Sequence, residues 1–434
     1  MLSTFTLANG IRVVTYTMPS LRSVHLQLSV KGGSLVENSK NNGVAHYMEH
    51  MLVQGIPSLP NVLQMSTFIE GLAGKYNAYT SQLAISYSMT VPFSATEDAI
   101  KIASEVFFEP LFPEESLEKE RRAVINEIKQ DMDSRWFKFN EFFKDIRFTK
   151  KSSLKRRISG TIDIVEKLTK EDLLSYWHKY FSPSNTYLFL IGNLNQAEIG
   201  NQLEMHFGKH LSVHKFSGYP KMSNSNDLGK RRVAIRNDPE LQVNYLDLVF
   251  PSLSLKDDLL NRVKQNIALI ILGRLRTSRL FQLLRYEKGL VYNVSANHSL
   301  WPDTGYAFIT SEVASEHLTE VLELSTRELT SFREKGPLEN ELTFTKNYLA
   351  NSWLMAFDNP SSIAEWISDD FLWKEKILLP EDYIKLLADI SVKDLVEVMQ
   401  NYWDMKKLQL IIQGPIENTP KNIKKFNSLI SQLR

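Results

Sequence analysis

The sequence predicts an α+β protein made of two similar halves, each a mostly antiparallel sheet with helices packed on one side. The first observation is an internal repeat, in which Leu168–Gly192 aligns without a gap on Ile390–Gly414. The second is that strand-like and helix-like segments come in blocks, which favours this arrangement over a doubly wound parallel sheet. The length of 434 residues allows two or three domains.

The two copies of the repeat share one local pattern. Each reads as a capped amphipathic helix, a short turn and an apolar strand that ends at glycine, and Asp172 falls on Asp394. We therefore expect a first half over residues 1–215 and a second half over residues 229–434. The polar segment at residues 216–228 is interpreted as the linker between them.

Hydrophobic periodicity outlines the elements of the first half, which the second half should repeat. Apolar or alternating runs predict strands over Ile11–Thr17, Val24–Val30, Ile85–Val91 and Thr186–Ile191, with Leu408–Gln413 as the repeat of the last. Helical periodicity predicts helices over Ser94–Phe108, Ser116–Met132 and Trp136–Phe148.

The composition excludes several functional classes. The 51 Lys and Arg residues balance 50 Asp and Glu, so no global field draws the chain to nucleic acid or to an anionic membrane. Because cysteine is absent, any metal must be held by histidine and carboxylate groups. No apolar run approaches the ~20 residues of a membrane helix, and the N-terminus lacks the features of a signal peptide. We therefore expect a globular, cytoplasmic protein with no nucleic-acid or membrane partner.

One short segment carries the candidate chemistry, the inverted motif formed by His46, Glu49 and His50. Residues 43–54 read as a helix closed by Gly55, and the apolar stripe of that helix leaves the three motif residues on the opposite face. Histidines four apart lie one turn apart, so their ring nitrogens can converge on one Zn²⁺. The glutamate then lies beside the metal, where it can take the proton of a zinc-bound water.

A catalytic zinc needs three protein ligands and one open position, so a third ligand must come from elsewhere. The helix predicted over Ser116–Met132 carries Glu120 and Glu127 two turns apart on one face, bordering its apolar stripe. A partly buried carboxylate in that position needs a cation or a hydrogen-bond partner. The second half contains no His-x-x-x-His pair, so we expect one zinc per chain.

These motifs resemble those of the inverzincin metallopeptidases of the pitrilysin and insulin-degrading enzyme type, and most of all the short branch similar to mitochondrial processing peptidase. In that family the third ligand follows the second histidine after about the same interval as the 76 residues between His50 and Glu127. The resemblance implies that His46, His50 and Glu127 bind Zn²⁺. It also implies that Glu49 is the general base and that Glu120 supports a ligand histidine without binding the metal.

The segment at residues 75–80 resembles the turn and edge strand with which family members hold substrate. This resemblance implies substrate-binding roles for Asn77, Ala78 and Thr80. An edge strand offers N–H and C=O groups without partners, so an extended peptide can add to it as a further strand.

In the second half, Arg285 and Tyr292 match the Arg/Tyr pair of the family. A guanidinium and a phenol are suitable donors for a substrate carbonyl and for the oxyanion that develops from it. Larger relatives place such a pair opposite the zinc motif across an enclosed chamber. Because this chain has the length of one such unit, the resemblance implies a dimer in which the pair acts on the zinc site of the partner. A homodimer is the simplest interpretation, and a heterodimer with a related chain is the alternative.

The sequence therefore predicts a zinc metalloendopeptidase that cleaves extended or unfolded peptides inside a chamber formed by a dimer. The general base on the zinc-bound water is Glu49. The alternative is a non-catalytic structural or assembly subunit of the same family, resembling the core proteins of respiratory complexes. A metal-dependent hydrolase of another bond is a third hypothesis, because zinc ligands alone do not select the substrate.

A second group of histidines competes as a metal site. His206, His210 and His214 are spaced by four, but Gly208 and Pro220 argue against one helix across the segment. We interpret these three residues as solvated histidines.

Overall fold

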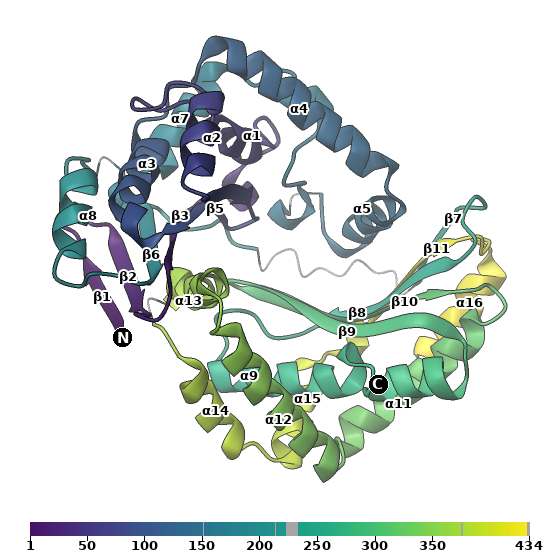
Figure 1. Cartoon of the computed structure of the whole chain (residues 1–434). Coiled ribbons are helices and arrows are strands. Elements are labelled where there is room, and N and C mark those ends of the chain that lie inside the picture. The colour runs from purple at the N-terminus through teal and green to yellow at the C-terminus, as the bar shows by residue number, and fades with distance from the viewer. Residues whose placement is uncertain (151, 213, 223–232, 375, 432–434) are drawn as a thin grey trace. The chain divides into compact units, whose positions relative to one another are not determined.

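The computed structural model describes residues 1–150, 152–212, 214–222, 233–374 and 376–431 (Figure 1). Part of the predicted linker, residues 223–228, and the start of the predicted second half, residues 229–232, lie outside the described residues. The chain forms two compact units. The first comprises Met1–Asp133, Arg156–Pro220 and Leu354–Leu378, and the second comprises Ser134–Lys155, Lys221–Trp353 and Leu379–Arg434. The units differ from the predicted halves, 1–215 and 229–434, because each contains a segment from the other half of the chain.

The first unit is built on a six-stranded sheet with the strand order β1-β2-β6-β3-β5-β4. Its strands are β1 (Leu2–Thr6), β2 (Arg12–Thr17), β3 (Ser23–Lys31), β4 (Lys75–Thr80), β5 (Ala84–Pro92) and β6 (Thr186–Gly192). Strands β2 and β6 pair in parallel, and every other pair of neighbours in this sheet is antiparallel. The four strands that apolar runs predict in this half are present as β2, β3, β5 and β6, with ends that differ by one residue.

Helices cover one face of this sheet and bury its largest apolar cluster. They are α1 (Val44–Leu52), α2 (Val62–Gly71), α3 (Thr96–Phe108), α4 (Glu114–Asp133), α6 (Ile162–Val165), α7 (Lys170–Tyr180) and α8 (Ile199–Phe207). The predicted helices over Ser94–Phe108 and Ser116–Met132 correspond to α3 and α4. The predicted helix over Trp136–Phe148 corresponds to α5 (Arg135–Arg147), which belongs to the second unit.

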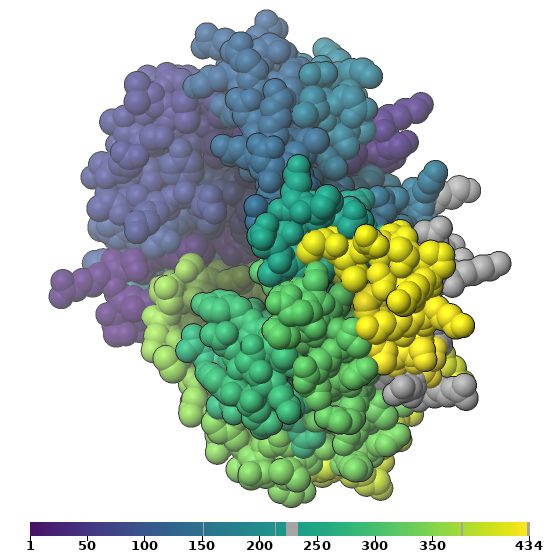
Figure 2. Space-filling model, turned by 90° about the vertical axis from the view of Figure 1, so that its right-hand side faces the viewer, coloured from purple at the N-terminus to yellow at the C-terminus, as the bar shows by residue number. Residues whose placement is uncertain are grey.

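The second unit repeats the plan with a five-stranded sheet in the order β7-β11-β8-β10-β9. Its strands are β7 (Val233–Asn237), β8 (Asn244–Pro251), β9 (Val291–Trp301), β10 (Thr304–Val313) and β11 (Gln409–Gly414). Its helical segments are α9 (Leu259–Leu269), the π-helix η6 (Ile270–Arg274), α10 (Arg279–Phe281), the π-helix η7 (Gln282–Glu287), α11 (Leu318–Lys335), α12 (Glu339–Ala356), α14 (Pro380–Ala388), α15 (Val392–Tyr402) and α16 (Pro420–Ile430). The C-terminal helix α16, yellow in Figure 2, packs beside α11 on the surface of this unit.

The five strands of the second sheet match β2-β6-β3-β5-β4 of the first in order, and β1 has no counterpart among the described residues. This confirms the α+β fold with two similar sheets and their helices. In the second sheet β7 and β11 form the parallel pair, as β2 and β6 do in the first. The repeated helices α7 and α15 begin with the same capping box, made by Thr169 with Asp172 and by Ser391 with Asp394. The aligned aspartates therefore mark the same helix start in both copies.

One helix also packs on the face of each sheet opposite to the main helices. In the first unit this helix is α13 (Pro360–Lys374), whose apolar side packs on the outer side chains of β2 and β6. Phe371 contacts the rings of Tyr187 and Phe189 edge-on, with centroids 5.9 and 6.2 Å apart. In the second unit α5 packs in the same way, and Phe139 stacks on Tyr245 with centroids 5.6 Å apart. Every residue of β6 is consequently buried.

The helices of the described residues include none that is both long enough and apolar enough to cross a membrane.

We expect Phe371→Ala to lower the free energy of unfolding of the first unit by about 3 kcal/mol, because it leaves a cavity beside two buried aromatic rings. Denaturant unfolding followed by tryptophan fluorescence measures the change. Phe93→Ala is the matched control, since Phe93 belongs to the first unit and is 51% exposed, and its effect should stay within about 0.5 kcal/mol. Equal effects of the two substitutions would contradict a packing role for α13.

Candidate functional site

Helix α1 presents the inverted motif on the face that its apolar stripe leaves free. Val44, Ala45, Tyr47, Met48, Met51 and Leu52 are buried without measurable exposure. His46, Glu49 and His50 lie between these positions and are only partly buried. The helix was expected over residues 43–54 and instead spans Val44–Leu52.

The early end of α1 has a local cause. The backbone N–H of Gln54 already bonds to the carbonyl of Met51, and its side chain donates to the carbonyl of His50. Gly55 therefore does not cap the helix. A Cβ atom at Gly55 would lie 2.5 Å from the carbonyl oxygen of Pro60, so glycine is required there by the close approach of two backbones.

The start of α1 is fixed by the buried carboxylate of Glu37. This group accepts hydrogen bonds from the backbone N–H of Gly43 and of Ala45, at 3.0 and 2.8 Å, and from the Asn42 side chain at 2.7 Å. Burial raises the pKa of Glu37 to about 7, while these donors and the nearby Arg156 oppose the shift. A carboxylate at this end of a helix satisfies N–H groups that have no partner within the helix.

His46, His50 and Glu127 meet at one point in the first unit. The Nε2 atoms of both histidines lie 3.6 Å from Glu127 Oε2, and one ligand atom from each residue falls within 4.8 Å of the others. Among the residues that the structure describes, no other group of three histidines, aspartates or glutamates is placed to hold a metal ion.

This donor set fits a zinc ion. Two ligand atoms about 2.0 Å from one tetrahedral zinc lie about 3.3 Å apart. This is close to the 3.6 Å between each histidine Nε2 and Glu127 Oε2. Burial, and then the neighbouring His50, lower the pKa of His46 to about 4. The ring is therefore neutral at physiological pH, which is the form that binds metals.

Glu120 lies about two turns before Glu127 on α4 and contacts a different ring nitrogen. Its Oε2 is 3.1 Å from His50 Nδ1, and its side chain is 13% exposed. With the Nδ1 proton donated to Glu120, the lone pair of His50 lies on Nε2, which faces Glu127. Glu120 itself is not part of the ligand group.

Glu49 lies outside the ligand group and is held by strand β4. Its Oε2 accepts a hydrogen bond of 2.8 Å from the hydroxyl of Thr80. Burial raises the pKa of the Glu49 carboxyl, and the hydrogen bond from Thr80 partly offsets this. The family resemblance assigned Thr80 to substrate binding, and the structure adds a hydrogen bond from Thr80 to the Glu49 carboxylate. Sequence reasoning missed this bond because the two residues lie 31 positions apart and share no local pattern.

Asn77, Ala78 and Thr80 belong to β4, the last strand of the first sheet. This strand pairs only with β5, so its other side is an open edge in the described unit. Exposed and half-buried residues alternate along it, with Asn77 exposed and the other two half-buried. The helix α1 packs against β4 and brings the motif face close to this edge.

Arg285 and Tyr292 are brought together within the second unit. The Arg285 guanidinium lies over the Tyr292 ring, 4.8 Å from its centroid, and donates to the carbonyl of Val291 at 3.3 Å. The Tyr292 side chain is 80% exposed, so its hydroxyl is accessible.

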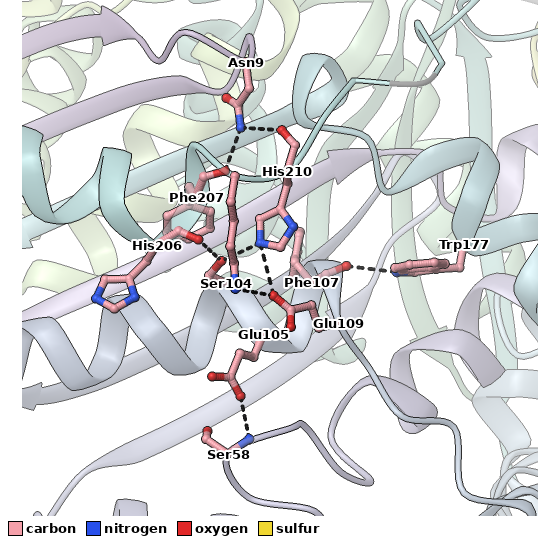
Figure 3. A network of polar contacts seen from close by, with 11 residues as sticks. Asn9, Ser58, Ser104, Glu105, Phe107, Glu109, Trp177, His206, Phe207 and His210 are labelled. Carbon is pink, nitrogen blue, oxygen red and sulfur yellow. Dashed lines mark hydrogen bonds and ion pairs between the residues drawn. The ribbon is translucent and has the colours of Figure 1, made fainter.

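Two of the three competing histidines, His206 and His210, make structural contacts (Figure 3). His210 Nε2 lies 3.1 Å from Ser104 Oγ and 3.6 Å from Glu109, and its ring stacks on Phe108. His206 points in another direction, 3.7 Å from Glu97. The two histidines join the end of α8 to α3 and do not converge on a common point. The side chains of His206 and His210 are partly buried, whereas the sequence predicted solvated residues. His214 is exposed, in agreement with that prediction.

The fold and this arrangement define a two-sheet α+β protein with a histidine–carboxylate cluster that could hold a metal ion. Two family profiles match the chain, "Insulinase (Peptidase family M16)" at residues 12–162 and "Peptidase M16 inactive domain" at residues 167–349. The chain belongs to this family, the insulinase or pitrilysin-like M16 peptidases.

Its relatives match along nearly the whole length. An "Uncharacterized zinc protease" of Rickettsia felis is 27% identical, with 94% of this chain and 96% of the relative covered. The mitochondrial-processing peptidase subunit beta of Dictyostelium discoideum is 25% identical, with 96% and 89% covered. The crystal structure of a "peptidase M16 inactive domain" from Pseudomonas fluorescens superposes with a TM-score of 0.87 at 18% identity, covering 96% of this chain and 98% of that one.

We expect Glu120→Gln to weaken zinc binding by about 10- to 100-fold, because the amide accepts the His50 Nδ1 proton less strongly than the carboxylate. Competition with a chromogenic chelator measures zinc affinity directly. Glu115→Gln, an exposed change on the same helix, serves as the control and should leave the affinity as it is. Unchanged affinity in Glu120→Gln would show that this contact does not support the ligand.

Proposed function

We propose that the chain is a zinc metalloendopeptidase that hydrolyses extended or unfolded peptides. The observation that carries the proposal is the division of roles on α1, where His46 and His50 converge with Glu127 while Glu49 lies beside them, bonded to Thr80. A carboxylate next to a metal centre but outside its ligand set is available for proton transfer. Membership of a peptidase family, with relatives named as zinc proteases, supports both the metal and the substrate class.

The proposed reaction divides the chemistry between metal and protein. His46, His50 and Glu127 would hold a zinc ion, which when bound would act as a Lewis acid on the scissile carbonyl and would make water nucleophilic near neutral pH. Glu49 accepts a proton from the attacking water as the water oxygen bonds to the carbonyl carbon. The same carboxyl group then gives this proton to the leaving amine nitrogen as the C–N bond breaks. The hydrogen bond from Thr80 holds the carboxylate in place for both transfers.

The open edge of β4 supports binding of an extended peptide. A strand added there would bond to backbone groups and would therefore depend little on side-chain identity. Thr80 stands at the end of β4 and contacts Glu49, so a peptide along Asn77, Ala78 and Thr80 would run past the proposed base.

Arg285 and Tyr292 are proposed to stabilise the substrate carbonyl and its developing oxyanion. As in the sequence-based hypothesis, the pair acts on the zinc site of a partner chain across a chamber formed by a dimer. A homodimer is the simplest form because one chain carries both parts, and a heterodimer with a related chain is the alternative. The cytoplasmic location likewise stays a prediction.

We expect Glu49→Gln to reduce peptide cleavage by about 100-fold or more, with zinc content unchanged, because the amide cannot accept a proton. Cleavage of a mixed peptide library, read by mass spectrometry, and metal analysis give the two readouts. Chelator should abolish the activity of wild type. Glu70→Gln on α2 removes an exposed carboxylate of the same type and should cleave normally. Near-normal cleavage by Glu49→Gln would make the assigned base wrong.

Mixing Glu49→Gln chains with Arg285→Ala chains should restore about a quarter of wild-type activity, since half of the dimers are mixed and each has one complete site. Pairing Glu49→Gln with Glu127→Gln is the control, because both lesions fall in the same site and no rescue follows. Heterodimers purified with two different tags and found inactive would exclude action in trans.

The second candidate function is that of a non-catalytic structural or assembly subunit of the same family. The match of residues 167–349 to the inactive-domain profile favours it, because that part of the chain supplies none of the residues of the metal centre. The intact motif at His46, Glu49, His50 and Glu127 argues against it, because such subunits need no proton-transfer group beside a metal centre. If the chain is a non-catalytic subunit, it should bind zinc but cleave no peptide in the library.

A further inference from the structure

A pocket of about 730 Å³ opens in the second unit beside the Arg285 and Tyr292 pair. Two further arginines line it: Arg274 ends the π-helix η6, and Arg276 follows in the turn before α10. The side chains of Phe281 and Tyr286, in edge-on contact at 5.3 Å, form an aromatic part of the wall.

The charge of this pocket is unbalanced. Three guanidinium groups line it against one carboxylate, that of the exposed Glu312. No carboxylate of the described residues lies within ion-pair distance of Arg274, Arg276 or Arg285. The contrast is Arg279, which is close in sequence and is bonded to both Glu328 and Glu341. The pocket therefore carries a net positive charge that the protein itself leaves uncompensated.

Arg274 is held rigidly although it has no ionic partner. Its Nε donates to Asn297 Oδ1 at 2.9 Å, and its NH1 donates to Asn266 Oδ1 at 2.6 Å. Neutral amides thus fix the direction of the guanidinium without cancelling its charge. Burial lowers the pKa of Arg274, which reflects the cost of keeping this cation partly away from water. An anion bound beside it would recover that cost.

Arg276 differs from Arg274 in that its side chain is exposed to solvent. Its carbonyl accepts a hydrogen bond of 2.7 Å from Gln282, which ties the turn to η7. A planar, forked guanidinium suits a carboxylate, with which it can form two parallel hydrogen bonds. One held and one exposed arginine at the same pocket are an arrangement suited to such a group.

We propose that Arg274 and Arg276 form a subsite for a carboxylate of the peptide substrate, either an aspartate or glutamate side chain or the C-terminal carboxylate. The inference rests on the proposed peptidase function, and it adds a preference for anionic peptides to a backbone interaction that is largely indifferent to side chains. Glu312 lines the same pocket and repels anions that come close to it. We therefore expect the subsite to accept a small anionic group, such as one carboxylate, that reaches the arginines.

The test uses four versions of one fluorogenic peptide, with glutamate or glutamine at a scanned position and with a free or amidated C-terminus. For wild type, kcat/KM should be about tenfold higher for the better carboxylate peptide than for its neutral counterpart. This ratio should fall towards one in Arg276→Gln and should fall below one in Arg276→Glu, because the new carboxylate repels an anionic peptide. The glutamate scan and the amidated peptide distinguish a side-chain carboxylate from a terminal one.

Arg327→Gln removes an exposed arginine on α11 outside this pocket and should leave the ratio unchanged. Binding of the same peptides to zinc-loaded Glu49→Gln, measured by fluorescence anisotropy, gives a readout that does not need cleavage. Selective binding to Glu49→Gln, together with no cleavage of any peptide by wild type, would contradict the proposed function and leave the subsite supported. Cleavage with a ratio near one in wild type, or an equal fall of the ratio in Arg276→Gln and Arg327→Gln, would overturn the subsite.

Discussion

The carboxylate of Glu37 holds the first turn of α1, and the geometry of the whole candidate site depends on that helix. By accepting hydrogen bonds from Gly43 and Ala45, it fixes where the helix begins and how it is rotated about its axis. A rotation of one residue would turn the motif by about 100° and carry His46 into the apolar core. The burial of one face and the capping of one end thus set the direction of every ligand that α1 supplies.

Two neighbouring elements complete what α1 begins, and each acts through a different atom. From α4, Glu127 faces the Nε2 atoms of the histidines while Glu120 takes the opposite nitrogen of His50. From β4, Thr80 donates a hydrogen bond to Glu49, the one acidic residue of α1. The proposed metal ligands and the proposed base of α1 are therefore held by different neighbours, the imidazoles by α4 and the carboxylate by β4.

Local signals in the sequence predicted the fold class and the elements, because periodicity and capping depend on residues a few positions apart. The helical phase of α1 and the repeated caps at Asp172 and Asp394 are of this kind. The grouping of His50 with Glu127 came from a resemblance, since no local pattern joins residues so distant in the chain. The bonds of Glu37 to the start of α1, and the packing of α13 on the sheet of the first unit, depend on tertiary contacts. A strand such as β6, buried on both faces, has a continuous apolar run that does not tell which helix covers the second face.

The exchange of α5 and α13 ties the assembly of the molecule to the order of its synthesis. Translation delivers β6 long before α13, so Tyr187 and Phe189 emerge on a sheet whose second apolar face has nothing to cover it. Exposed apolar surface of this kind promotes aggregation until it is covered, here by residues 360–374. For the same reason, cutting the gene between its two repeats would not yield two self-sufficient proteins: each fragment would lack the helix that closes its own sheet.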